Sequence, residues 1–251
     1  MAVNQVCNQC GMPIRPGFKF CNVCGAPVKA EPVQQGNVMP YSDLMGYKGH
    51  ALRMLTGSRT GEFVGIYPNC VIGRMNADVK IDDNTLSPRH AQLLTTKDEV
   101  TLEDLDSLNG VFLRLTDKHV LCDNDIILAG EHYFLYECFS QDNVEGDFGA
   151  TFYASPSRGE KFRLIEILSG GRRGRACTAP DGGIAVGRTE GDFLFPDDAY
   201  MNAKHFTIRW TQRGGILVDY SENGTFIQIR KATKVSTGDL FFCGHTLFTV
   251  I

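Results

Sequence analysis

The sequence predicts a mainly β protein in which two antiparallel β-sandwiches follow a small cysteine-rich module. Three observations support this fold class: short apolar runs separated by turn-forming residues, a long internal repeat, and two Cys-x-x-Cys pairs close to the N-terminus. A chain of 251 residues is long for one sandwich and suits two domains with an accessory module. The expected divisions are the module over 1–28, a linker over 29–48, a first domain over 49–140, a second linker over 141–160 and a second domain over 161–251.

The predicted strands are short apolar runs that end near Gly, Asn or Asp. No stretch carries a convincing apolar stripe of helical period longer than two turns, so long helices are not expected. Many short strands at close spacing are typical of an antiparallel sandwich. In the first domain the runs cover 51–55, 63–66, 90–94, 100–102, 111–113, 126–128 and 132–136.

The second domain repeats the first. Four landmarks recur at an offset of 114 or 115 residues: Gly73-Arg74 as Gly187-Arg188, His90 as His205, Asn109-Gly110 as Asn223-Gly224, and Gly130 as Gly244. A repeat unit of this length indicates a domain that was duplicated once, because the units of solenoid proteins are much shorter.

The cysteine-rich module has the spacing of a structural metal site. Its two Cys-x-x-Cys-Gly sequences supply four thiolates, from Cys7, Cys10, Cys21 and Cys24. Four thiolates bind one Zn²⁺ tetrahedrally and leave no open coordination position for catalysis. The segment resembles the short zinc ribbon found at the N-termini of many bacterial proteins. We expect one structural Zn²⁺ that folds a segment too small to have its own core, with a docking or nucleic-acid surface as the alternative role.

Charge and composition exclude several classes of protein. The net charge is −4, with −6 over residues 49–140 and +3 over 161–251, so no polybasic surface for nucleic acid is expected. No apolar run approaches the ~20 residues that cross a bilayer, and the N-terminus lacks the pattern of a secretory signal. The cysteines outside the module are single and lie among apolar residues, which fits a reducing compartment. A cytoplasmic protein with a protein partner is therefore expected.

Four motifs follow one another in the first domain. A Gly-Arg pair follows a strand at 73–74, Ser-x-x-His lies at 87–90, Asn-Gly at 109–110, and an Asn-Asp turn at 124–125. In this order they resemble the forkhead-associated (FHA) domain, although Pro88 and Leu108 stand where that family favours a polar residue and a threonine. The resemblance covers about 49–140 and, in a more divergent form, 161–251. It implies FHA-type β-sandwiches whose loops bind phosphothreonine peptides.

The residue types in these motifs suit a phosphate dianion. The guanidinium of Arg74 matches two phosphate oxygens in a fork of charge-assisted hydrogen bonds, and Ser87 adds a hydroxyl donor. Arg89 is a further cation in the same loop. The resemblance implies that Asn109 binds the peptide backbone instead of the phosphate. The candidate site of the first domain is therefore Arg74, Ser87, Arg89 and Asn109.

The remaining motif residues are expected to support the loops from within. The resemblance implies hydrogen bonds from the histidine to the loops, and the glycines suit backbone turns that side chains would obstruct. In the two copies these structural residues are Gly73, His90 and Gly110, and Gly187, His205 and Gly224.

The second copy offers a weaker candidate site, made of Arg188, Asn202, Lys204 and Asn223. Asn202 stands where the family has serine, and Glu222 takes the place of Leu108. A carboxylate beside a phosphate dianion lowers affinity by repulsion between like charges. A packing or protein-interaction surface is therefore the alternative for this copy.

The sequence thus favours a phosphothreonine-dependent adaptor in bacterial Ser/Thr kinase signalling. Its partner would be a phosphorylated protein, such as a kinase or its substrate. A phosphate-independent scaffold or oligomerisation protein is one alternative, and a zinc-ribbon regulator associated with nucleic acid is another. An enzyme is disfavoured, because the sequence has no Gly-rich phosphate loop before a helix and no nucleophile motif.

Overall fold

A computed structural model describes residues 38–39, 49–96, 99–139, 159–179 and 182–251. These residues form a mainly β structure with one short 3₁₀ turn, Ser169–Gly171, which confirms the predicted fold class. All strand pairs are antiparallel except β4 with β5 and β14 with β15. No helix in the described ranges is long and apolar enough to span a membrane.

The first unit is a sandwich of two sheets. One sheet contains β3, β2, β21, β20 and β8, with β1 (Val38–Met39) paired to its edge, and the other contains β19, β7, β6, β4 and β5. Its strands are β2 (Ala51–Met54), β3 (Phe63–Gly65), β4 (Cys70–Gly73), β5 (Val79–Lys80), β6 (Ala91–Thr95), β7 (Val100–Asp104), β8 (Val111–Arg114), β19 (Thr233–Val235), β20 (Leu240–Cys243) and β21 (Thr246–Val250).

The second unit repeats this architecture. One sheet contains β18, β10, β11, β12 and β13, and the other contains β15, β14, β16, β17 and β9. Its strands are β9 (His119–Val120), β10 (Ile126–Ala129), β11 (His132–Cys138), β12 (Phe162–Leu168), β13 (Arg172–Thr178), β14 (Gly183–Gly187), β15 (Phe193–Leu194), β16 (Phe206–Thr211), β17 (Gly214–Asp219) and β18 (Thr225–Gln228).

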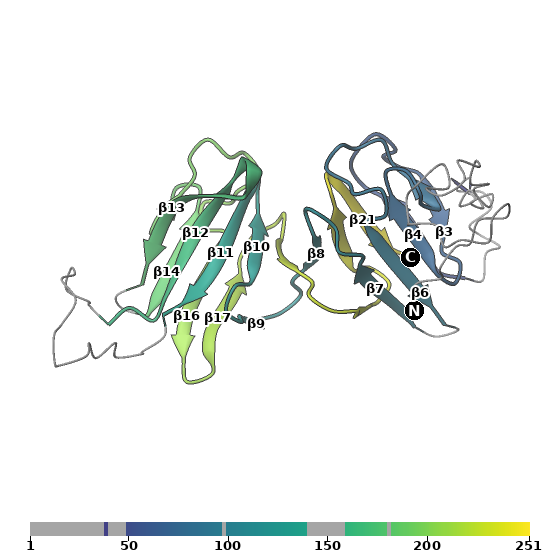
Figure 1. Ribbon diagram of the computed structural model, residues 1–251. Helices are drawn as coiled ribbons and strands as arrows, with labels where there is room; N and C mark the ends of the chain where they lie inside the picture. Colours follow the sequence, from purple (N-terminus) through teal and green to yellow (C-terminus); the bar gives the residue numbers. More distant parts are fainter. Residues whose placement is uncertain (1–37, 40–48, 97–98, 140–158, 180–181) are drawn as a thin grey trace, which may run out of the picture.

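The two sequence repeats exchange their last three strands. Strands β9 to β11 follow β8 in the chain but pair with β17, β18 and β12 of the second unit. Strands β19 to β21 follow β18 but pair with β7, β8 and β2 of the first unit. The exchange is visible in Figure 1, where the yellow β21 stands among the blue strands and the teal β10 and β11 stand beside the green β12.

Strands β8 and β18 join the two units at a local twofold axis. Leu113 pairs with Ile227, which is its own counterpart in the repeat, and Phe112 pairs with Gln228 as Arg114 pairs with Phe226. The pairing makes the two halves of the large sheet continuous. Phe112 and its counterpart Phe226 are buried together with Leu128 in a small core at this joint.

Each unit has its own hydrophobic core, and both cores contain exchanged residues. In the first unit, Phe241, Phe248 and Val250 are buried with residues of β2, β4 and β6. In the second unit, Ile127, Phe134 and Tyr136 are buried with residues of β12, β14 and β16. The exchanged strands therefore contribute to the core of the unit with which they pair.

The strand pairing departs from the domain ranges expected from the sequence, 49–140 and 161–251. The first unit consists of 49–114 and 229–251, and the second unit is the uninterrupted segment 115–228. The repeat offset shows which strands are alike, but both copies of a hairpin carry the same apolar alternation. The sequence pattern therefore does not specify which copy each hairpin joins.

Candidate functional site

Hydrogen bonds join three loops of the first unit into one site. Arg74 directly follows β4, Ser87 lies between β5 and β6, and Asn109 directly precedes the β8 loop glycine. The backbone N–H of Arg74 donates to the carbonyl of Ser87 at 3.1 Å. The hydroxyl of Ser87 accepts a hydrogen bond from the N–H of Leu108 at 3.0 Å. The structure therefore brings together Arg74, Ser87 and Asn109, which the sequence places apart.

His90 lies behind these loops and is fully buried. Its Nδ1 accepts the backbone N–H of Ser87 at 3.1 Å, and its Nε2 lies 3.0 Å from the carbonyl oxygen of Gly110. Because Nδ1 accepts a hydrogen bond, the neutral ring carries its proton on Nε2 and donates it to Gly110. Burial lowers the pKa of His90, although the hydrogen bond to Gly110 opposes this shift. A neutral His90 thus links the serine loop to the asparagine loop.

Two glycines allow the loops to approach closely. A Cβ on Gly73 would overlap the backbone carbonyl of Pro88, which also accepts the N–H of Met75 at 3.2 Å. Gly110 has a φ of +79°, and a Cβ there would overlap the side chain of Gln228 from the second unit. Neither position accommodates a side chain without movement of its neighbours.

The site presents unused hydrogen-bond donors at its surface. The side chains of Arg74 and Arg89 are exposed, and neither guanidinium has a polar partner within the described ranges. The Ser87 hydroxyl uses its oxygen as an acceptor, so its proton is free to donate outward. Asn109 donates its amide N–H to the carbonyl of Thr85 at 2.7 Å, which fixes the side chain and directs its remaining groups to solvent. Two cations and a hydroxyl beside a fixed amide suit an anionic group carried on an extended peptide.

Three residues of the site were not predicted from the sequence. Asp83 accepts hydrogen bonds from both the N–H and the hydroxyl of Thr85, at 2.8 and 2.6 Å. The N–H of His245, on the β20–β21 turn, donates to the other carboxylate oxygen of Asp83 at 2.9 Å. An Asp-x-Thr sequence signals such a turn locally, but the contact with a residue 162 positions later leaves no local signal.

The second unit contains the same loop arrangement. The ring of His205 accepts the N–H of Asn202 at 3.1 Å and lies 3.2 Å from the carbonyl of Gly224, and burial lowers its pKa as well. The side-chain oxygen of Asn202 accepts the N–H of Glu222 at 3.2 Å, as Ser87 does in the first unit. Gly187 again lies where a Cβ would overlap a backbone carbonyl. The loop frame is therefore duplicated.

The groups displayed on this second frame are different. Arg188 is half-buried and has no polar side-chain partner among the described residues, but Lys204 lies over the ring of Tyr220 at 5.0 Å from the ring centroid. The exposed Glu222 adds a negative charge beside Asn223. Arg114 of the first unit donates to the carbonyl of Glu222 at 3.0 Å, so the joint contacts this loop directly. Fewer free cations and an added carboxylate make this frame less suited to phosphate.

The expected zinc ligands Cys7, Cys10, Cys21 and Cys24 lie outside the described residues. Within the described ranges, no group of three or more His, Cys, Asp or Glu side chains is placed to bind a metal ion. Burial raises the pKa of the Cys70 thiol to about 12, and Cys243 is also fully buried with a raised pKa. Both thiols therefore stay protonated and pack as small apolar side chains.

Comparisons with known proteins agree with this description of the first site. The sequence model of the FHA domain matches residues 70–130, and that of the zinc-ribbon domain matches residues 6–28. The FHA match contains Arg74, Ser87, Arg89 and Asn109. The second copy lies outside both matches, and a search of curated proteins finds no match to the chain.

Two solved structures illustrate the similarity. One is the crystal structure of the FHA domain of the CT664 protein from Chlamydia trachomatis, with 14% identity and a TM-score of 0.33 over 80% of this chain and 95% of that chain. The other comes from a structural and functional study of phosphothreonine-dependent FHA domain interactions. It shows 25% identity and a TM-score of 0.24 over 34% of this chain and 92% of that chain.

The buried histidines predict a loss of stability in mild acid. The pKa values of His90 and His205 are lowered from 6.5 in the folded state, so the unfolded chain takes up protons first as the pH falls. The free energy of unfolding should therefore decrease as the pH falls from about 7.5 to about 5, as measured by urea unfolding at each pH. The double variant His90→Gln, His205→Gln should show a shallower dependence, and an unchanged slope would contradict this explanation.

Proposed function

We propose that the chain is a phosphothreonine-dependent adaptor in bacterial Ser/Thr kinase signalling and that it binds its partner chiefly through the first unit. It acts by binding and not by catalysis, in the cytoplasm, and its partner is a phosphorylated kinase or kinase substrate. Arg74, Ser87 and Arg89 bind the phosphate group, and Asn109 binds the peptide backbone.

One observation carries this proposal. Two arginines without a polar partner among the described residues stand beside a serine hydroxyl, on loops that a buried histidine and two close-packed glycines keep in place. A site whose donors are positioned before the ligand arrives loses little conformational entropy on binding. A few hydrogen bonds to a dianion, at ~1.5–3 kcal/mol each, are sufficient for micromolar affinity. The FHA match over the same residues supports phosphothreonine as the ligand.

A peptide library tests the proposal. The full chain is screened against a degenerate phosphothreonine library, and the best sequence is then titrated with threonine, phosphothreonine or phosphoserine at the central position. We expect micromolar binding of the phosphothreonine form and a loss of at least about 30-fold for the threonine form. Equal affinity for both forms would refute phosphate-dependent capture and favour a phosphate-independent scaffold.

We assign the second frame a weaker affinity for the same class of ligand. Arg188 and Asn202 resemble Arg74 and Ser87 in position, but Glu222 opposes a dianion. The variant Glu222→Leu should therefore increase the number of phosphothreonine peptides bound per chain at saturation, as measured by calorimetry. An unchanged stoichiometry would leave the second frame as a packing surface.

We also propose that the N-terminal cysteines bind one structural Zn²⁺, in line with the zinc-ribbon match over residues 6–28. Elemental analysis of the purified chain should find one zinc per chain, and Cys10→Ser should lower this value. Peptide affinity should stay within about twofold, because the loops of the first site lie in residues 73–110. A metal-free wild-type chain would refute the zinc assignment.

A further inference from the structure

We propose that each recognition site is positioned by a hairpin turn from the other sequence repeat, so that the first site depends on the β20–β21 turn near the C-terminus. The inference deepens the proposed function, since it concerns the geometry of the same loops. Its central observation is that the exchanged hairpins end directly on the loops of both frames.

In the first unit, a continuous path of hydrogen bonds runs from the exchanged turn to the ligand-facing amide. The N–H of His245 donates to Asp83 at 2.9 Å, and the ring of His245 lies 3.3 Å from the Thr85 hydroxyl. Asp83 accepts both donors of Thr85, and the Thr85 carbonyl accepts the amide of Asn109 at 2.7 Å. Although burial alone would raise the pKa of Asp83, the hydrogen bonds from Thr85 and His245 lower it. The C-terminal turn thus fixes the direction of the Asn109 side chain.

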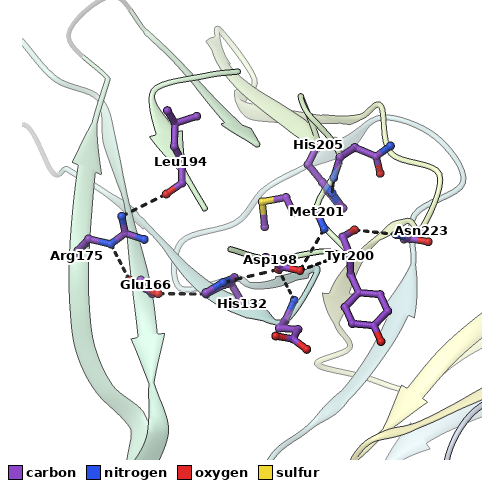
Figure 2. A network of polar contacts seen from close by, with 11 residues as sticks. His132, Glu166, Arg175, Leu194, Asp198, Tyr200, Met201, His205 and Asn223 are labelled. Carbon is purple, nitrogen blue, oxygen red and sulfur yellow. Dashed lines mark hydrogen bonds and ion pairs between the residues drawn. The ribbon is translucent and has the colours of Figure 1, made fainter. Parts of the chain in front are cut away.

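The second unit contains the matching path with the partners reversed. The N–H of Glu131, from the β10–β11 turn, donates to Asp198 at 2.8 Å, and Asp198 accepts the N–H of Tyr200 at 2.8 Å. The carbonyl of Tyr200 accepts the amide of Asn223 at 2.8 Å. Figure 2 shows this path with Asp198 at its centre. The two exchanged turns therefore have the same task in opposite units.

Side chains at equivalent positions match the exchanged partners. His132, at the start of β11, lies 3.2 Å from the buried Glu166 of β12, and Arg175 binds the other carboxylate oxygen at 3.1 Å (Figure 2). In the first unit the positions of His132 and Glu166 are taken by the buried Thr246 and Met54. Returning each hairpin to its own repeat would bring His132 next to Met54. It would also leave Glu166 without its histidine, and a buried carboxylate that loses a partner is destabilising.

Paired cysteines test the exchange without any ligand. Arg53 lies opposite Thr249 in the exchanged arrangement, whereas without exchange it would lie opposite Leu135, the counterpart of Thr249. Directly opposed residues of antiparallel strands are within disulfide range. In a Cys122→Ser background, mild oxidation should cross-link Arg53→Cys with Thr249→Cys within one chain and should not cross-link Arg53→Cys with Leu135→Cys. Peptide mass spectrometry identifies the bond, and the opposite pattern would refute the exchange.

A matched pair of glycine variants tests the positioning of the site. Gly244 and Gly130 both have a φ of +57° on equivalent turns. A Cβ on Gly244 would lie 2.6 Å from the Thr85 hydroxyl and 2.7 Å from Asp83, whereas a Cβ on Gly130 would overlap Asp198. Gly244→Ala should weaken phosphothreonine binding by the first site about tenfold. Gly130→Ala, which lies within the expected first domain, should leave it unchanged.

The two experiments separate failure of this inference from failure of the proposed function. If the wild-type chain binds no phosphothreonine peptide, the proposed function fails, and the cross-links alone decide whether the repeats exchange strands. If the wild-type chain binds and Gly130→Ala weakens the first site while Gly244→Ala does not, the positioning by the C-terminal turn is refuted. Thermal unfolding of both variants checks that they are folded to the same extent.

Discussion

A chain that ends after residue 140 should not bind a phosphothreonine peptide, although it retains all candidate binding residues of the first site. The truncation removes β19 to β21, which pair with β7, β8 and β2 and contribute Phe241, Phe248 and Val250 to the core of the first unit. The hairpin of the same repeat would bring Ile127 to the place of Phe241 and Tyr136 to the place of Val250. One side chain is too small and the other too large for this core, and such mismatches cost several kcal/mol together (~1–3 each).

A deletion variant provides the control for this truncation. Joining residue 114 directly to residue 229 removes the uninterrupted second unit and keeps every strand of the first. This shortened chain should recover phosphothreonine binding, whereas the chain ending at 140 should show neither a cooperative unfolding transition of the first unit nor binding by calorimetry. Full affinity in the chain ending at 140 would show that the first repeat closes on its own hairpin.

Replacing Arg74 should cause the largest loss of affinity among single substitutions in the first site. The guanidinium is exposed and has no polar partner among the described residues, so the substitution Arg74→Ala leaves the fold intact and removes only contacts with the ligand. Losing a forked pair of hydrogen bonds to a dianion costs about 2–3 kcal/mol, which corresponds to roughly 30- to 150-fold in Kd. Arg74→Lys should retain part of this affinity, because it keeps the charge and loses the fork.

The counterpart in the second unit offers a matched control. Arg188→Ala removes the same side chain from the duplicated frame and should change the affinity of the first site by less than about twofold, because the two side chains share no described partner. Isothermal titration of the three variants with one phosphothreonine peptide decides the matter. Equal losses from Arg74→Ala and Arg188→Ala would contradict the assignment of capture to the first unit.

Apolar alternation and turn residues were sufficient to predict most strands of the first repeat. The structure begins β6 at Ala91, directly after His90, so the boundary expected at residue 90 lies one residue too early. Strand β4 was identified only through the Gly-Arg motif that ends it, because its residues are all buried and show no alternation. The chain-wide pairing was beyond the sequence, since the same apolar pattern occurs in both exchanged hairpins.

The candidate site was predictable only in part for a related physical reason. Arg74, Ser87 and Asn109 belong to motifs that recur in order, so their types and spacing indicated them. Asp83 and His245 act through backbone donors across 162 positions, and a backbone N–H has no residue signature. The dependence of one repeat on the other therefore becomes apparent only when the strands are paired.

The coupling energy between the phosphate and Arg74 tests the central claim most directly. Wild type and Arg74→Ala are each titrated with the threonine and phosphothreonine forms of one peptide, and the four affinities form a double-mutant cycle. Capture of the phosphate by Arg74 predicts a coupling energy of about 2 kcal/mol or more, with both variants binding the threonine form equally weakly. A coupling energy near zero, with phosphorylation strengthening the binding of both chains alike, would contradict it.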